Sequence, residues 1–311
     1  MGEKNIGAKK HHCVPRAYLK YFANEKNIIH VIDKKKSNEY DSNIADVAVQ
    51  NNYNTISPAP FVSTPNGDPL YYEKEYCHLI EHKIPKIIDN IIAACVLSNR
   101  KFPILTKEIK EDLSRFIAIQ FYRVPEQRKR LYEFGETIVK ETDREVLKEL
   151  NEATLDDKSK NEFIESLNQF SYTPDINKLI HLKISTNEMI INEMAQSLIN
   201  NHYWMIYDNT FYKEFPFVTS DNPIILYNIS DKKVGNDGNG TEEPATVILI
   251  ALTPKYILIL YHKNCIFDFS KTETDICHSL IDDLQFVKNI NKIQYKQDCE
   301  KIFTPPVDLN Y

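Results

Sequence analysis

Hydrophobic residues recur at intervals of three and four through the middle of the chain, a spacing that places them on one face of an α-helix. Between Tyr71 and Ser98 these positions are Leu79, Ile80, Ile84, Ile87, Ile88 and Ile91. A second helical pattern follows Pro103, and Thr106 stands where an N-cap is expected. The pattern predicts a helix over 71–98 and another that begins at Thr106.

Further helices are predicted up to residue 200. Pro125 either kinks the helix that begins at Thr106 or starts another, which runs to about residue 150. After a polar stretch, helical patterns return near 161–167 and over 176–200. The middle of the chain is therefore expected to be almost wholly helical.

The hydrophobic period changes after residue 200. Four short runs rich in β-branched and aromatic residues follow, bounded by turn residues: YWMIY, PIILY, TVILIAL and KYILILY. Such runs predict strands, and the middle two suggest burial on both faces. Near the N-terminus the pattern predicts a short helix at 15–22 and then a strand in NIIHVIDKK, and a last helix is expected at about 273–289.

This order of elements predicts an α+β fold, in which the helical middle packs against a mixed or antiparallel sheet of N-terminal and C-terminal strands. The expected parts are a strand and turn module at 1–70, a helical region at 71–200 and a β-rich region at 201–311. No clear linker separates them, so we expect one integrated domain over 1–311.

Composition narrows the classes of protein that fit. The 311 residues carry a formal net charge of −6, so the chain as a whole lacks the basic character typical of nucleic-acid binding. No glycine-rich phosphate loop occurs, and we expect no nucleotide cofactor. The six cysteines form no CxxC pair, and the longest apolar stretch is broken by TPK. We therefore expect reduced thiols, a cytoplasmic location and no membrane partner.

The segment KKHHCVPRAYLKYF contains the first candidate chemistry. His11 and His12 stand just before a predicted helix start, where a bend could direct both imidazoles toward one site. The alternative is a polar lead-in with a capping or solvated histidine. Cys13 is more readily a small buried residue than a nucleophile, because sequence neighbours rarely have the geometry of a Cys–His pair.

A second candidate is HLIEH, which matches the H-x-x-E-H pattern of zinc peptidases. His78 and His82 would bind zinc one helical turn apart, and Glu81 would activate water. Chance agreement and solvated histidines are the alternative.

Two more segments carry candidate residues. In RFIAIQFYRVPEQR, Gln120 and Arg123 lie near a helix end, where a guanidinium suits phosphate or carboxylate binding, or simply interacts with the helix dipole. In FVTSDNPIILY, the residues Ser220, Asp221 and Asn222 interrupt two strands. They form either an Asx-turn or part of a site that faces the histidines.

Taken together, these segments resemble the bacterial DUF4238 family. The resemblance lies in HHCVPRAYLKYF, NNYNTI, EHKIPKII, IQFYRVPEQR, FVTSDNPII and IALTPKYILIL, which occur in the family's order. The family lacks an established function, and its members are suspected to act in bacterial conflict and phage defence. The resemblance gives weight to His11, His12, Glu81, Arg123, Asp221 and Asn222, and less to His78 and His82.

The leading hypothesis is a nuclease-like hydrolase that uses a divalent metal, Mg, Mn or Zn, and acts on nucleic acid in phage defence. The expected catalytic residues are His11, His12, Glu81 and Asp221. The expected metal ligands are His12, Glu81 and Asp221, and the expected substrate ligands are Gln120, Arg123, Ser220 and Asn222.

Two other hypotheses stay open. In the first, the same residues bind a ligand or a phage protein without breaking a bond, as a sensor module. In the second, His78 and His82 hold the zinc ion of a peptidase. Partner proteins of a defence cassette or a second copy of the chain are expected under any of them.

Overall fold

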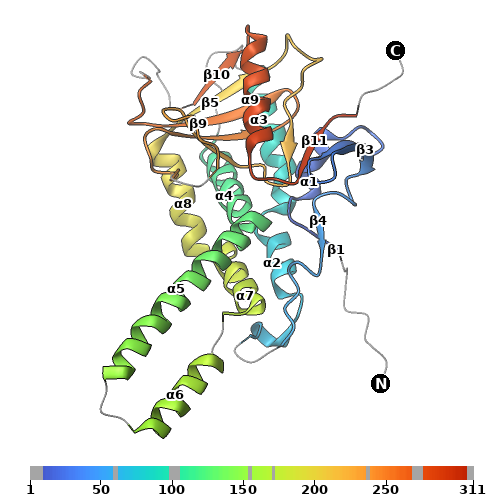
Figure 1. Ribbon diagram of the computed structural model, residues 1–311. Helices are drawn as coiled ribbons and strands as arrows, with labels where there is room; N and C mark the ends of the chain where they lie inside the picture. Colours follow the sequence, from blue (N-terminus) through green and yellow to red (C-terminus); the bar gives the residue numbers. More distant parts are fainter. Residues whose placement is uncertain are drawn as a thin grey trace, which may run out of the picture.

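A computed structural model describes residues 10–58, 62–97, 106–152, 156–169, 172–235, 239–267 and 276–306. Sheets lie toward one end of the molecule and helices run from them toward the other (Figure 1). The α+β class is confirmed, with the helices drawn from the middle of the chain.

Among the described residues, the largest sheet has five strands in the order β10-β5-β9-β8-β7, and all of them lie between residues 202 and 280. Their bounds are β5 His202–Asp208, β7 Ile225–Asn228, β8 Thr246–Ala251, β9 Tyr256–His262 and β10 Ile276–Leu280. Neighbours are antiparallel except β10 and β5, which run parallel. Every residue of β8 is buried, as expected for a strand covered on both faces.

The N-terminal and C-terminal segments join in a second sheet, ordered β3-β2-β11-β6. Its strands are β2 Ile28–Asp33, β3 Asn38–Asn43, β6 Thr219–Ser220 and β11 Lys301–Thr304. A separate antiparallel pair joins β1, Lys10–His12, to β4, Val49–Asn51. The expected combination of N-terminal and C-terminal strands therefore occurs in the four-stranded sheet, whereas the five-stranded sheet is C-terminal alone.

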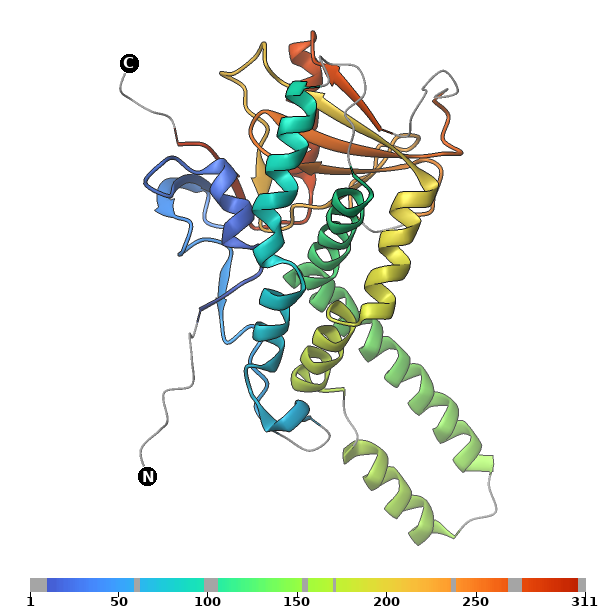
Figure 2. The ribbon, with the colours of Figure 1, turned by 180° about the vertical axis from the view of Figure 1, so that it is seen from behind.

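The helices connect and cover these sheets. Short ones are α1 Arg16–Leu19, followed by the 3-10 turns η1 Lys20–Phe22, η2 Pro65–Gly67 and η3 Glu81–Lys83. Longer ones are α2 Tyr71–Leu79, α3 Ile84–Leu97, α4 Lys107–Arg123, α5 Pro125–Glu152, α6 Asp157–Gln169, α7 Pro174–Ser185, α8 Glu188–Asn201 and α9 Leu284–Lys296. In both views α5 and α6 extend away from the rest of the molecule (Figures 1 and 2). Among the described helices, none combines the length and apolar character needed to span a bilayer.

Helix α4 lies at the centre of the core. Phe116, Ile117 and Ile119 are at most 1% exposed, and α4 packs against α3, α7 and α8. The predicted N-cap is confirmed, because the Thr106 hydroxyl oxygen accepts a hydrogen bond from the Ile109 amide. Helix α4 ends at Arg123, Val124 is extended and Pro125 starts α5, so the proline begins a new helix.

Three predicted helices differ from the structure. The one expected over 176–200 is divided at Thr186 and Asn187 into α7 and α8. The helix expected over 71–98 is interrupted at Ile80, whose φ of −148° leaves the helical region and separates α2 from η3 and α3. In the helix expected at about 273–289, Ile276–Leu280 instead forms strand β10 beside β5. The segment 276–280 is a strand because it pairs with the edge of the sheet at β5, and the local sequence pattern does not show that this edge is available.

Candidate functional site

The opening histidine segment is fastened into the protein by strand pairing and by buried side chains. Strand β1 pairs with β4, which places His11 opposite Gln50. The His11 side chain is fully buried, and its Nδ1 accepts a hydrogen bond of 2.9 Å from the Asn54 amide. The Asn54 side chain in turn donates to a Glu73 carboxylate oxygen at 2.6 Å. His11 therefore orders the loop after β4.

His12 is half-buried and lies beside the helices that follow. Its Nε2 is 3.3 Å from the carbonyl oxygen of Ile44, to which it donates. Burial lowers the pKa of His12, an effect that the Ile44 carbonyl partly offsets, so the imidazole is neutral at pH 7. The backbone carbonyl of His12 accepts a hydrogen bond of 2.6 Å from Arg123.

Arg123 joins three segments that are distant in the sequence. It is 1% exposed, and its two terminal nitrogens lie 3.2 and 3.3 Å from one carboxylate oxygen of Glu81. Its guanidinium carbon lies 4.3 Å from the centre of the Tyr76 ring. One turn earlier on α4, Gln120 donates to the Cys13 carbonyl at 3.1 Å. In this arrangement Gln120 and Arg123 hold the histidine segment on α4, and a substrate would reach them only if this network opened.

Cys13 lies between these groups as a buried thiol. It is 2% exposed, and burial raises its pKa to about 12. A thiol in this state is a poor nucleophile at neutral pH. The structure is thus consistent with the interpretation of Cys13 as a small packing residue.

The zinc-peptidase pattern loses its helical basis. Helix α2 ends at Leu79, so His78 and His82 do not lie one turn apart on a continuous helix, as the prediction required. The Nδ1 of His82 instead lies 3.2 Å from the Cys77 carbonyl, and Glu81 is paired with Arg123. The prediction that one continuous helix carries H-x-x-E-H is therefore wrong.

The turn formed by Ser220, Asp221 and Asn222, which we name the SDN turn, forms hydrogen bonds with α9 and with the segment between α9 and β11. The Ser220 hydroxyl oxygen accepts hydrogen bonds from the Asn222 amide at 3.0 Å and from the Gln294 side chain at 2.9 Å. The Asn222 side chain donates to the Asp298 carbonyl at 3.0 Å. Ser220 is fully buried, so it supports the turn from within, whereas Asp221 and Asn222 reach a hollow in the surface.

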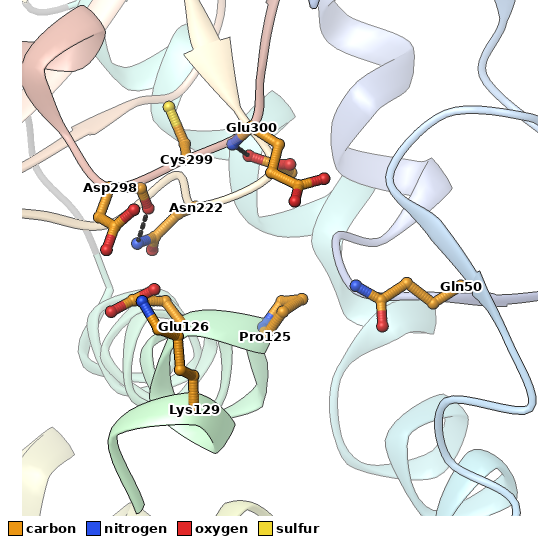
Figure 3. A pocket seen from close by; sticks show the side chains of 9 residues that line it. Gln50, Pro125, Glu126, Lys129, Asn222, Asp298, Cys299 and Glu300 are labelled. Atoms are coloured by element: carbon orange, nitrogen blue, oxygen red, sulfur yellow. Dashed lines mark hydrogen bonds between the residues drawn. The ribbon is translucent and has the colours of Figure 1, made fainter. Parts of the chain in front are cut away.

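This hollow, which we name the acidic hollow, has a volume of about 270 Å³. Among the described residues that line it, carboxylates come from Glu126, Asp221, Asp298 and Glu300, and an ammonium comes from Lys129. Figure 3 shows Glu126 and Lys129 on the first turn of α5, facing Asn222 and Asp298, with Gln50 of β4 on another side. Three segments therefore meet at the acidic hollow: the SDN turn, strand β4 and the start of α5.

Two carboxyl groups of the acidic hollow, those of Glu126 and Asp221, have pKa values above those of free carboxyls. Burial raises the pKa of Glu126, and a hydrogen bond with the neighbouring Asp298 carboxyl group and its charge raise it further, although the Lys129 charge and a hydrogen bond from Arg130 partly offset this rise. Burial also raises the pKa of Asp221 to about 6, although the backbone amides of Glu300 and Lys301 donate to its Oδ1. Carboxyls with raised pKa values in a hollow are candidates for proton transfer.

The predicted metal ligands occupy separate surroundings. Glu81 is paired with Arg123, His12 with the Ile44 carbonyl, and Asp221 with two backbone amides at the start of β11. Within the described ranges, no group of three or more His, Cys, Asp or Glu side chains is placed to hold a metal ion. The metal set of His12, Glu81 and Asp221 stays a prediction.

Most residues that line the acidic hollow were not predicted from the sequence. Gln50, Glu126, Lys129 and Asp298 were not singled out, although Glu126 and Lys129 lie within or beside the RVPEQR segment. Pro125 was a usable signal, because proline is favoured at the first position of a helix. It therefore places Glu126 in the first turn of α5, at the end of the helix. Asp298 carried no such signal.

We expect Asp221→Asn to stabilise the folded chain by about 1–2 kcal/mol at pH 7.5. The folded pKa of Asp221, about 6, lies above its usual pKa of 3.8, so the folded state loses stability as the pH rises through this range. Asparagine keeps the acceptor oxygen without the charge. Unfolding in urea at pH 4 and 7.5 checks this: the variant's advantage should grow with pH, and an equal or lower stability at pH 7.5 would contradict it.

The fold and the site define an α+β protein in which buried polar side chains fasten the N-terminal and C-terminal segments around one helix junction, beside a hollow rich in carboxyl groups. The chain belongs to the DUF4238 family, described as a protein of unknown function, whose family model matches residues 10–306. Searches of curated proteins and of solved structures gave no match.

Proposed function

We propose that the protein hydrolyses phosphodiester bonds of nucleic acid and that the reaction takes place in the acidic hollow. The observation that carries the proposal is the Glu126–Asp298 carboxyl pair, which faces Asp221 and Asn222 across this hollow. Two interacting carboxyls share a proton, so one can donate while another carboxylate accepts. Acid–base hydrolysis needs this pair of roles.

In the proposed reaction, the oxygen of a water molecule forms a bond to phosphorus while the ester P–O bond breaks. The Asp221 carboxylate accepts the proton that the water loses. Protonated Glu126 gives its proton to the leaving oxygen, so the products are a phosphate monoester and an alcohol. Asp298 holds the proton on Glu126 through their hydrogen bond.

A divalent ion remains part of the proposal. Carboxylate oxygens are the ligands that Mg²⁺ and Mn²⁺ prefer, and Mg²⁺ is often held by one or two carboxylates together with a substrate phosphate. The acidic hollow offers such carboxylates, and the ion would arrive with the substrate. It would neutralise the phosphate charge and promote ionisation of the attacking water.

A second hollow supports a phosphate-bearing substrate. It measures about 520 Å³ and shares Gln50, Pro125 and Lys129 with the acidic hollow. We name it the tyrosine hollow, since Tyr53 and Tyr132 line it. Cations and aromatic rings are the usual means of holding single-stranded nucleic acid, and they supply locally the positive charge that the whole chain lacks.

Cleavage of labelled oligonucleotides tests the proposal. The full chain is incubated with single-stranded RNA or DNA and with Mg²⁺, Mn²⁺ or Zn²⁺, and a parallel sample contains a chelator. We expect metal-dependent cleavage that Asp221→Asn lowers by about 100-fold. The control Asp231→Asn, an exposed carboxylate on the loop after β7, should keep full activity. Folded protein that cleaves neither polymer with any ion would refute the proposal.

The second candidate is a sensor module that binds the same kind of ligand and leaves it intact. The observation in its favour is that His11, Arg123 and Ser220, all from the family-like segments, are buried and bonded within the protein. Recovery of intact ligand after tight binding would support this candidate. A phage-defence role, with nucleic acid or a cassette protein as partner, is part of both proposals.

A further inference from the structure

Arg128, on the first turns of α5, uses two of its three guanidinium nitrogens in hydrogen bonds within the protein. Its Nε donates to the Nδ1 of His181 at 3.2 Å, and Nη1 donates to the Tyr53 carbonyl at 2.9 Å. Burial and the Arg128 charge lower the pKa of His181 to about 3, so this imidazole is a neutral acceptor. In the described part of the chain, the buried Nη2 has no hydrogen-bond partner. An unsatisfied buried donor destabilises the folded chain, and a ligand oxygen that accepts from it would offset this cost.

Lys178, on α7, brings a second positive charge into the tyrosine hollow. Its Nζ donates to the Asn52 carbonyl at 2.7 Å. Burial, and after it the charge of Arg128, lowers the pKa of Lys178 to about 8, although the charge of the nearby Asp175 carboxylate acts in the opposite direction. The exposed carboxylates Glu133 and Asp175 also line this hollow, but in the described residues neither forms an ion pair with Arg128 or Lys178. Two cations kept close without a paired carboxylate make a binding site for an anion.

The wall beside these cations is aromatic. The guanidinium carbon of Arg128 lies 3.5 Å from the centre of the Tyr53 ring, so this ring orients the cation. Tyr132 is half-buried, and its ring centre lies 5.7 Å from that of Tyr172. A volume of about 520 Å³ lies within the range of about 300–1,000 Å³ typical of ligand pockets. The hollow can hold a flat ring together with an anion.

We propose that Arg128 Nη2 and Lys178 Nζ bind a phosphate group in the tyrosine hollow and that a nucleobase of the same ligand lies against Tyr132. The ligand class is therefore a nucleotide. Nucleotide binding at this site does not depend on the proposed function. Only the role of the site in holding the substrate of hydrolysis rests on it. Lys129, which both hollows share, would lie between the held phosphate and the bond to be cleaved.

Calorimetric titration tests this site without any turnover. The full chain is titrated at pH 7.5, in a chelator, with AMP, with inorganic phosphate and with adenosine. We expect AMP to bind more tightly than inorganic phosphate and adenosine to bind more weakly than AMP. Lys178→Gln should raise the Kd for AMP about tenfold. The control Lys183→Gln removes an exposed charge from the same helix and should leave the Kd unchanged.

Arg128→Lys provides a second variant, because it keeps the charge but loses the planar donor set, and it should also weaken AMP binding. Raising the pH from 7.5 to 9.5 should weaken binding too, since Lys178 loses its proton while AMP stays a dianion. No AMP binding, or equal Kd values for wild type and Lys178→Gln, would overturn the site. Equal affinity for AMP and inorganic phosphate would overturn the nucleobase contact. AMP binding without oligonucleotide cleavage would refute the hydrolase alone.

Discussion

Replacing Arg123 with alanine is expected to lower the free energy of unfolding by about 3–5 kcal/mol, the cost of breaking a buried ion pair by removing one partner. The Arg123 guanidinium is 1% exposed and bonds both Glu81 and the His12 carbonyl. Its loss leaves that carbonyl without this donor and the Glu81 carboxylate without its cation. Equilibrium unfolding in urea measures the change. Arg123→Lys should also destabilise the chain, because one ammonium cannot replace two guanidinium nitrogens.

Arg115→Ala is the matched control on the same helix. Arg115 pairs with Glu188 at 2.9 Å, but the Glu188 side chain is 56% exposed, so water already stabilises that carboxylate. Exposed pairs contribute about 0–1 kcal/mol, and we expect a change in this range. If Arg123→Ala were as mild as Arg115→Ala, Arg123 would not be the link between the histidine segment, Glu81 and α4.

Replacing Glu126 with glutamine is expected to lower the rate of phosphodiester cleavage by about 10²–10⁴-fold, the contribution typical of a general acid. The amide keeps the size of the side chain and has no proton to give to the leaving oxygen. Wild-type activity should fall as the pH rises through the raised pKa of Glu126, and the variant should lose this limb of the pH–rate profile. Its thermal unfolding should stay close to that of the wild type, since the glutamine carbonyl oxygen can still accept the hydrogen bond that Arg130 Nε donates to Glu126 at 3.2 Å.

Glu141→Gln on the same helix is the control for charge. Glu141 is exposed and further along α5, so its loss changes the net charge equally but leaves the acidic hollow intact. We expect wild-type rates and an unchanged pH profile. A Glu126→Gln variant with the activity and pH profile of the wild type would remove Glu126 from the reaction.

Much of the fold follows from local patterns along the chain. The helical period and the Thr106 cap predict α4, and the β-branched runs after residue 200 predict β5, β8 and β9. Local patterns fail where tertiary contacts decide. Ile80 continues a helical period, yet the chain leaves the helical region there. Ile276–Leu280 was expected to be helical, and it is a strand because the edge of β5 is available for pairing.

The site could be predicted only in part, for a physical reason. Asp221 and Asn222 could be found because short polar residues interrupt a strand pattern, and both line the acidic hollow. Glu126 and Asp298 could not be paired from the sequence, since 172 positions separate them and only the contact of α5 with the segment before β11 brings them together. The unpaired Nη2 of Arg128 could not be predicted, because it depends on which groups the fold brings next to the guanidinium.

Isotope incorporation from water tests the central claim most directly. The full chain is incubated with a dinucleotide and Mn²⁺ in water enriched in ¹⁸O, and the phosphate monoester product is weighed by mass spectrometry. Hydrolysis in the acidic hollow predicts one ¹⁸O atom in each phosphate monoester molecule formed by the wild type and none in the alcohol, and about 100-fold less monoester with Asp221→Asn. No labelled product from folded wild-type protein, or equal amounts from both proteins, would contradict a hydrolase site in the acidic hollow.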